Sequence, residues 1–464
     1  VSNGNEFNHK HFKVADGVKF IDLTELGLEF MPIGTEIYSF GGIFNGNKAI
    51  FNIHLDTDSN YQGIFHTLGE TAHVFDLTIN GFIRGRGYIG ALAGRNLGRI
   101  TNVTNYASIT SQNNESGGND TGGITGFNSG ILTNVMNYGQ VTSNSSYIGG
   151  IAGQNTGQIQ GAYNRANVTG FGNVGGIVGM NSGQITNAYN IASITATESV
   201  VGGIAGTTNQ DIYYSFNTGD ITAGLSVAGG IAGVSNHARL EGVYNGGTII
   251  AYRTQSAGIV AYFNGGTIHD AYHFGSTFAQ DNVGIIVAYY VSGTISRTYY
   301  DKDMLSIDVS PNGLIKPERA VGNREVSTPV GLYHGQMLGL SAFSSSNLNL
   351  QNTNKFKLEP SSLNDSFYPQ ITFFSNHANQ QIRIDSLESV RVKSFIIGQG
   401  TQENPYLIRN ESDWLLLADS TTSGNDYRNV HFVVNQQIDE LDFSSQFNLV
   451  PVGNLLNPFN GHVD

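Results

Sequence analysis

Hydrophobic and polar positions alternate over short distances along most of this chain. In segments such as "GGIVG", "GQIT" and "SIT", Ile or Val recurs between small or polar residues, and Gly or Asn-Ser and Asn-Thr pairs interrupt the alternation. A period of two residues is typical of short, half-buried β-strands bounded by turns. No window of ten residues carries the 3.6-residue period of a helix, so the pattern predicts an all-β protein.

The alternating segments recur at a nearly fixed interval. A glycine opens each phrase, and successive glycines are mostly 26–28 residues apart. The one interval of 33 residues contains the extra segment "NNESGGND" (Asn113–Asp120), which we expect to form a loop. The nine glycines are Gly63, Gly90, Gly123, Gly150, Gly176, Gly203, Gly230, Gly258 and Gly284.

A fixed period of this size is the signature of a solenoid. We predict a parallel β-helix of about nine coils of ~27 residues, each with three short strands. With coils stacked at the spacing of strands in a sheet, about 4.8 Å, the rod would be roughly 40 Å long.

Stacking of identical coils explains the residues that recur at the same place in each phrase. The aromatic column contains Tyr163, Tyr189, Phe216, Tyr244 and Tyr272, and we expect its rings to stack. The asparagine column contains Asn164, Asn190, Asn217 and Asn245, and a second one contains Asn96, Asn128, Asn155 and Asn181. We expect these asparagines to occupy inside corners in the left-handed conformation and to bond to the next coil.

Composition excludes several classes of protein. The 464 residues carry a net charge of −13, whereas binding to nucleic acid requires a basic face. No cysteine is present, so there is no disulfide framework and no cysteine-based zinc site. No stretch of 18 apolar residues occurs, so we expect no membrane span.

The phrases "GGIAGQNTGQI" and "GGIVGMNSGQI", each followed by "AYN", resemble the GLUG-motif repeats of large bacterial cell-surface proteins. Such repeats occur in adhesin-like proteins and in the non-catalytic part of Gram-positive IgA-cleaving metallopeptidases. The resemblance implies an extracellular location at the cell surface and a β-helical, structural role. It implies no activity of its own.

The flanking segments divide the chain into four parts. We expect a cap and solenoid entry at 1–60, the solenoid at 61–302, a capping or trailing segment of small α/β or irregular structure at 303–395, and the start of a following module at 396–464. The last part repeats residues 2–49, because "HFVVNQQIDELDF" (His431–Phe443) matches "HFKVADGVKFIDL" (His11–Leu23) and the terminal "FNGHVD" matches "FNGNKA" (Phe44–Ala49). Either the chain is a piece of a tandem-module protein, or the last part completes the first coil of another copy.

The sequence offers few candidate chemical groups. A zinc peptidase needs H-E-x-x-H, and none of the 12 histidines is followed by Glu. The carboxylates of the solenoid fall in different columns of the coil alignment, so we interpret them as solvated surface groups and predict no enzyme activity. Calcium is the one cofactor to weigh, at Asp56, Asp58 and Asn60 or at Asp301 and Asp303, although segments of this kind are more often turns.

Four arginines stand close together in a sparsely charged background. Arg84, Arg86, Arg95 and Arg99 could contact an anionic glycan, or they could simply form a solvated face.

We therefore predict a non-enzymatic extracellular module that acts as a stiff spacer and adhesive surface. Its partners would be other modules or copies of the same protein, and a cell-surface glycan or protein. Two alternatives stay open: a glycan-binding or polysaccharide-degrading β-helix, and a subunit that assembles head to tail into a filament or sheath.

Overall fold

The computed structural model describes most of the first 332 residues and several short stretches beyond them. The described residues are 4, 6–24, 30–111, 120–279, 281–302, 306–308, 319–332, 336–337, 342–343, 347–350, 355–357, 368–374, 401–402, 405–408, 414, 417–418, 421, 427–434, 452 and 459–463. The predicted loop Asn113–Asp120 lies outside them except for its last residue. No helix in this part of the chain is long and apolar enough to cross a lipid bilayer.

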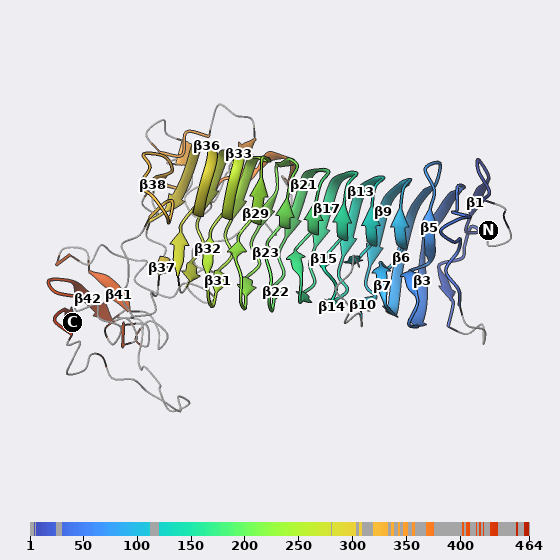
Figure 1. Ribbon diagram of the computed structural model, residues 1–464, viewed down its shortest axis with the longest axis horizontal. Coiled ribbons are helices and arrows are strands. Elements are labelled where there is room, and N and C mark those ends of the chain that lie inside the picture. Colours follow the sequence, from blue (N-terminus) through green and yellow to red (C-terminus); the bar gives the residue numbers. More distant parts are fainter. Residues whose placement is uncertain are drawn as a thin grey trace.

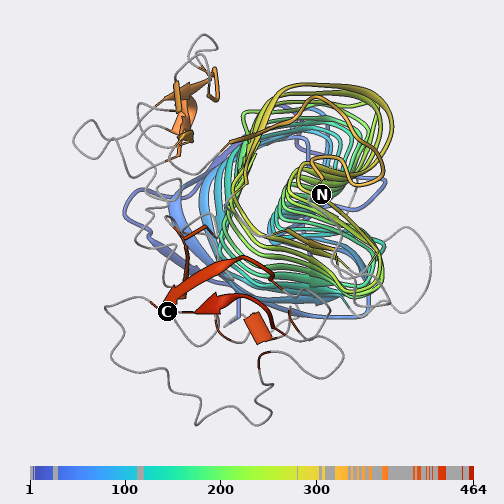
Figure 2. The same ribbon diagram turned by 90° about the vertical axis from the view of Figure 1, so that its left-hand side faces the viewer.

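The chain winds into a parallel β-solenoid, which confirms the predicted fold class (Figure 1). One coil contains β15 (Tyr147–Gly149), β16 (Ala152–Asn155), β17 (Gln158–Asn164) and β18 (Val168–Gly170), and the next contains β19 (Asn173–Gly175), β20 (Val178–Asn181), β21 (Gln184–Asn190) and β22 (Ile194–Ala196). The predicted number of three strands per coil is wrong, because the "GGIVG" phrase turns at its paired glycines and contributes to two strands. Viewed along the rod, successive coils superpose on one bent outline (Figure 2).

Strands of the same type pair in register from coil to coil. The nine-stranded sheet contains β4 (Asn60–Gln62), β7 (Gly87–Ile89), β11 (Asp120–Gly122), β15, β19, β23 (Val201–Gly202), β28 (Ala228–Gly229), β32 (Gln255–Ala257) and β35 (Asn282–Gly284). The strands that follow them are β5 (Phe65–Leu68), β8 (Ala93–Asn96), β12 (Thr125–Asn128), β16, β20, β24 (Ala205–Thr208) and β29 (Ala232–Asn236). The strands before the next coil are β10 (Ser108–Ser111), β14 (Val141–Ser143), β18, β22, β27 (Ile221–Ala223), β31 (Ile249–Ala251), β34 (Thr277–Ala279) and β37 (Ser306–Asp308).

The third strand of each coil, such as β17, shows how far the stack of coils extends. The nine predicted coils contribute β6 (His73–Gly85), β9 (Arg99–Asn105), β13 (Ile131–Asn137), β17, β21, β25 (Ile212–Tyr213) with β26 (Phe216–Asn217), β30 (Arg239–Asn245), β33 (Val260–His273) and β36 (Val287–Asp301). The stack continues at one end through β3 (Ile43–Asp56) to β1 (His11–Lys13) and β2 (Phe20–Asp22), and at the other end to β38 (Val330–Leu332). The rod therefore has twelve rungs along this face.

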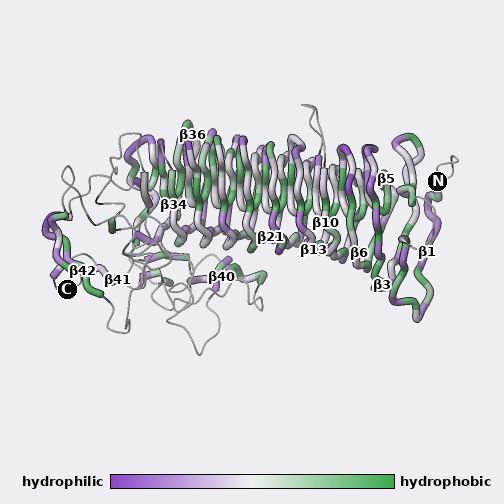
Figure 3. The backbone as a smooth tube through the Cα atoms, turned by 90° about the horizontal axis from the view of Figure 1, so that it is seen from below, coloured by the Kyte–Doolittle hydropathy of each residue, from purple (hydrophilic) through white to green (hydrophobic). Residues whose placement is uncertain are grey.

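Inward-facing Ile, Val, Leu and Ala form one apolar core along the rod. This core runs from Val14 to Val321, and most of its members are fully buried. Hydrophobic and hydrophilic residues alternate along each coil as the strand period requires (Figure 3). Each coil therefore contacts chiefly its two neighbours, as in other repeat proteins.

The asparagine columns form buried ladders. Asn164 Nδ2 donates to Asn190 Oδ1 at 2.7 Å, and Asn190 Nδ2 donates to Asn217 Oδ1 at 2.7 Å. The predicted bond to the next coil is thus present. The predicted left-handed conformation is wrong for this column, because positive φ angles occur instead at the bend three residues earlier, as at Asn187 (φ 58°). An extended backbone keeps each ladder asparagine in the strand pairing, while the bend takes the strain.

The aromatic ladder lies on the outside of the coils. Tyr189 and Phe216 stack with centroids 5.0 Å apart, and Tyr244 and Tyr272 do the same at 5.0 Å. The predicted stacking is present, but the rings belong to a second apolar cluster that the chain after the solenoid covers. Phe374, at the end of the 3₁₀ helix η4 (Thr372–Phe374), packs edge-on against three consecutive rings, with centroids 5.3–6.1 Å from those of Tyr163, Tyr189 and Phe216.

The segment after the solenoid thus folds back along one flank of the rod. A short antiparallel pair, β39 (Phe356–Lys357) and β40 (Gln370–Ile371), precedes η4. Farther along the chain, β41 (Tyr406–Ile408), β42 (His431–Val434) and β43 (His462–Val463) form a three-stranded parallel sheet. This small sheet lies at the end of the rod opposite the N-terminus (Figure 1).

Candidate functional site

A row of identical turns forms a groove on the surface of the solenoid. Each turn joins two strands through Asn-x-Gly, as in Asn155-Thr156-Gly157 between β16 and β17. Glycine is required at the third position because an added Cβ at Gly157 would lie 2.0 Å from the carbonyl oxygen of Gly130 in the preceding coil. Glycine at this position therefore lets the turns of successive coils stack closely.

The second asparagine ladder lies directly beneath these turns. Asn128 Nδ2 donates to Asn155 Oδ1 at 2.7 Å, and Asn155 Nδ2 donates to Asn181 Oδ1 at 2.8 Å. Each of these side chains also forms a hydrogen bond within its own turn. For example, Asn181 Oδ1 accepts a hydrogen bond from Gly183 N at 3.4 Å. All three asparagines are fully buried, so the ladder fixes the spacing and orientation of the turns.

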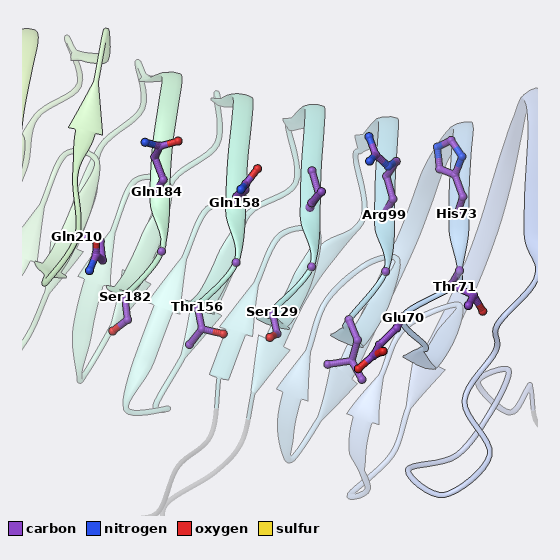
Figure 4. A pocket seen from close by; sticks show the side chains of 17 residues that line it. Glu70, Thr71, His73, Arg99, Ser129, Thr156, Gln158, Ser182, Gln184 and Gln210 are labelled. Carbon is purple, nitrogen blue, oxygen red and sulfur yellow. The ribbon is translucent and has the colours of Figure 1, made fainter.

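Polar side chains line the groove on both sides and follow the axis of the rod (Figure 4). One wall carries the residue after each glycine, including Arg99, Gln158 and Gln184, and the other carries small hydroxyl residues such as Thr156 and Ser182. The groove has a volume of about 620 Å³ and crosses successive coils. Equivalent groups therefore repeat along it at the spacing of strands in a sheet, about 4.8 Å.

The groove is charged only toward its N-terminal end. Glu70, His73 and Arg99 lie there, and the amide and hydroxyl groups follow. Burial lowers the pKa of His73, the Arg99 guanidinium lowers it further, and Asp76 opposes them. The imidazole is accordingly neutral at pH 7, and its Nε2 lies 3.2 Å from Thr101 Oγ1.

Regularly spaced neutral donors and acceptors are groups that can hydrogen-bond to an extended polymer lying along the groove. Gln158 and Gln184 can each donate and accept, and their shared column places them in equivalent positions one coil apart. Across the described residues, no three His, Asp or Glu side chains gather in a way that could hold a metal ion.

The four arginines singled out in the sequence do not form one patch. Arg84, Arg95 and Arg99 lie on three different strands of the coil and in three different columns. Arg84 forms an ion pair with Asp56, and the Arg95 guanidinium lies 5.6 Å from the Phe127 ring centroid. Arg86 N bonds to the carbonyl of Ser59 in the turn before β7. Arg99 is the one of the four that lines the groove.

In each of the two candidate calcium segments, one carboxylate already has a protein partner. Asp56 is paired with Arg84, while Asp58 is exposed two residues further on. Asp301 is buried and accepts a hydrogen bond from the Tyr368 hydroxyl at 2.5 Å. Its predicted partner Asp303 lies outside the described residues.

Three carboxylates that we expected to be solvated are buried instead. Glu241 and Asp270 both form ion pairs with Lys355, which comes from the segment that covers the aromatic ladder. Arg297 also contacts Asp270, with Nε 2.6 Å from Oδ1. Coil alignment could not reveal this network, because Lys355 lies 85 residues from Asp270 in the sequence.

Asp120 is the third buried carboxylate. Neither of its oxygens has a hydrogen-bond partner within the described part of the chain, and burial raises the pKa of this carboxyl to about 8. The groove itself was also missed by sequence reasoning, although the Gln that follows Gly in "NTGQI" and "NSGQI" was a signal for it.

No protein-family model matches this chain. No curated protein matches it either. Among solved structures, a "putative immunoglobulin A1 protease" from Bacteroides ovatus is similar at 14% sequence identity, over 79% of this chain and 87% of that chain, with a TM-score of 0.26. Similarity of this degree carries no argument about function, so the residues themselves must supply it.

Proposed function

We propose that this chain is a non-enzymatic, stiff spacer module of a bacterial surface protein, exposed outside the cell. The observation that carries the proposal is the continuity of its internal ladders. Six consecutive asparagine side chains of one ladder, from Asn105 to Asn245, are fully buried. Hydrogen bonds of 2.7–2.9 Å join the side-chain amide of each to the next. A rod whose successive coils are joined by buried hydrogen bonds resists bending, and resistance to bending is the property that a spacer needs.

The GLUG-like phrases support the proposed location. They resemble repeat regions of large adhesin-like proteins, in which a rod would hold other parts of the molecule away from the cell. The groove and the exposed loops would then be surfaces that meet partners.

Removing one whole coil tests the spacer proposal. Deletion of residues 176–202 joins Gly175 to Gly203, so each ladder loses one rung and keeps its register. We expect a folded rod that is about 4.8 Å shorter by small-angle X-ray scattering. When the chain is displayed on a cell, the reach of a tag at its far end should shorten by the same step. Deletion of only residues 176–189 is the control, because it puts every later column out of register and should abolish folding. Loss of folding in both variants would contradict a modular rod.

A second function is favoured by the polar groove. We propose that it binds an extended polysaccharide, with the repeated Gln, Ser and Thr side chains as hydrogen-bonding groups. The double variant Gln158→Ala and Gln184→Ala should weaken retention in affinity electrophoresis with the polysaccharide that binds. Gln154→Ala, on a neighbouring strand but outside the groove, should not. Product release by the purified chain that a carboxylate substitution abolishes would overturn the non-enzymatic proposal.

A further inference from the structure

The row of polar side chains in the groove is interrupted at one place by two apolar residues. Leu97 N donates to Leu68 O at 2.9 Å, just as the hydroxyl residues of later coils donate to the coil before them. Leu97 therefore stands where those coils have Ser or Thr. Ile131 stands where they have Gln, between Arg99 and Gln158 in its column. Both apolar side chains line the groove and are half-buried.

The turn at this end of the groove is longer than the turns that follow. Residues 69–72 join β5 to β6, whereas only two residues join β8 to β9. Arg99 N bonds to the carbonyl of the last turn residue at 2.9 Å, so Glu70 and Thr71 are the two extra residues. Thr71 Oγ1 donates to Gly41 O at 2.8 Å, which fixes the turn to the coil before it. The extra length therefore places the Glu70 carboxylate at the end of the groove.

Two opposite charges flank the apolar pair. Glu70 lies on the wall opposite Arg99 (Figure 4). Both side chains are exposed, and neither has a hydrogen-bond or ion-pair partner within the part of the chain that the structure describes. The rest of the groove lining is uncharged apart from His73. A carboxylate, a guanidinium and an apolar surface are thus available together at one end of the groove.

These groups are complementary to one kind of sugar. A guanidinium binds a carboxylate through two parallel hydrogen bonds. A carboxylate accepts hydrogen bonds from amide N–H groups and hydroxyls. An apolar pair covers the methyl of an acyl group and removes it from water. A sugar that carries both a carboxylate and an acylamino group presents all three features on one ring.

We propose that this end of the groove is a subsite for a terminal N-acylated sugar acid, whose neutral chain lies along the Gln, Ser and Thr side chains. The proposal rests on the polysaccharide binding proposed above. The sugar carboxylate binds Arg99, and the acylamino N–H donates to Glu70. The acyl methyl lies against Leu97 and Ile131. The acid is terminal because a net charge of −13 on the protein disfavours a polymer that is anionic throughout.

Two substitutions give this coil the residues of the coils that follow. Arg99→Gln introduces the residue found at Gln158, and Leu97→Ser introduces the residue found at Ser129. Both variants should fold, because the new residues already occupy equivalent positions. Arg95→Gln is the matched control, since Arg95 belongs to the same coil but lies on a neighbouring strand outside the groove.

Fluorescent oligosaccharides measure the preference for the acid. Tetrasaccharides of β-1,4-linked glucose or galactose are capped with N-acetylneuraminic acid or with N-acetylmuramic acid, and each is compared with its carboxyl methyl ester by fluorescence anisotropy. The two caps separate two sources of the same chemistry. We expect one capped chain to bind about tenfold more tightly than its ester.

Each substitution should remove one part of this preference. Arg99→Gln should bring the affinity for the acid down to that for the ester and leave the ester unchanged. Leu97→Ser should weaken both by about fivefold, because both retain the acetyl group. Arg95→Gln should change neither.

Equal binding of the capped chain and its ester, or a preference that survives Arg99→Gln, would overturn the subsite. Failure of every capped chain to bind would do the same. The groove is judged separately, because Gln158→Ala with Gln184→Ala should weaken the acid and the ester alike. Retention of a neutral polysaccharide through these two glutamines would then leave the groove proposal standing without the subsite.

Discussion

The substitution His273→Asn isolates the effect of one buried imidazole at the end of a ladder. His273 takes the position that asparagine occupies in the preceding coils, and its Nδ1 lies 3.0 Å from Asn245 Nδ2. Gly275 N donates to the same Nδ1 at 3.4 Å, and Nε2 lies 3.1 Å from Thr277 Oγ1. The Asn245 carbonyl oxygen also lies 3.1 Å from Nδ1, so either tautomer of the neutral ring finds hydrogen-bond partners here.

Burial lowers the pKa of His273 from 6.5 to about 4. Above pH 6.5 the imidazole is neutral in both folded and unfolded chains, so its contribution to stability is fully present there. As the pH falls from 6.5 to 4, the unfolded chain binds a proton that the folded chain excludes. Stability is lost by about 1.4 kcal/mol for each pH unit, to a total of about 3 kcal/mol.

Asparagine at this position continues the ladder and does not titrate. We expect the wild type and the variant to be within about 1 kcal/mol of each other at pH 7.5, and the variant to be more stable by about 2.5 kcal/mol at pH 4.5. Guanidinium unfolding followed by circular dichroism at both values measures the difference. The reasoning fails if His273→Asn shows no gain in stability in acid.

Three further substitutions test other parts of the structure. Asn190→Ala removes one hydrogen-bond partner from each of its two buried ladder neighbours and the bonds within its own turn, and we expect a loss of about 3 kcal/mol in the free energy of unfolding, whereas the exposed Asn167→Ala should cost under 0.5 kcal/mol. Phe374→Ala uncovers the aromatic ladder at a cost of about 3 kcal/mol, and limited proteolysis should then cut the segment after the solenoid while the rod stays resistant. Burial raises the pKa of Asp120 from 3.8 to about 8, so stability is full below pH 4 and falls as the pH rises to 8. Asp120→Asn should remove that slope in thermal unfolding measured from pH 5 to 9.

Much of the fold could be predicted because every coil repeats the same local information. The glycine interval specified nine of the twelve rungs, and the columns that contain Asn190 and Tyr189 specified the register between coils. The other rungs escaped because Ile43–Asp56 and Val330–Leu332 lack the glycine phrase and are recognised only by their pairing.

The features that escaped prediction depend on contacts between distant parts of the chain. Periodicity identified the aromatic column but could not show that it faces outward, since a ring buried in a core and a ring buried under a later segment produce the same pattern. Phe374 lies 158 or more residues from the rings it covers. Similarly, the predicted arginine patch rested on closeness in sequence. Successive strands of a coil run in different directions, so the arginines lie on different faces.

The asparagine ladders also give the rod a direction. In each described step from Asn105 to Asn245 the amide nitrogen of the earlier coil donates to the oxygen of the later one. Their dipoles therefore add along the axis, and chains of hydrogen bonds aligned in this way polarise one another. The two ends of this ladder therefore differ electrically within the core. The ladder ends inside the rod, because the next position is Ile79 before Asn105 and His273 after Asn245, so this polarity belongs to the core and is not displayed at either end of the molecule.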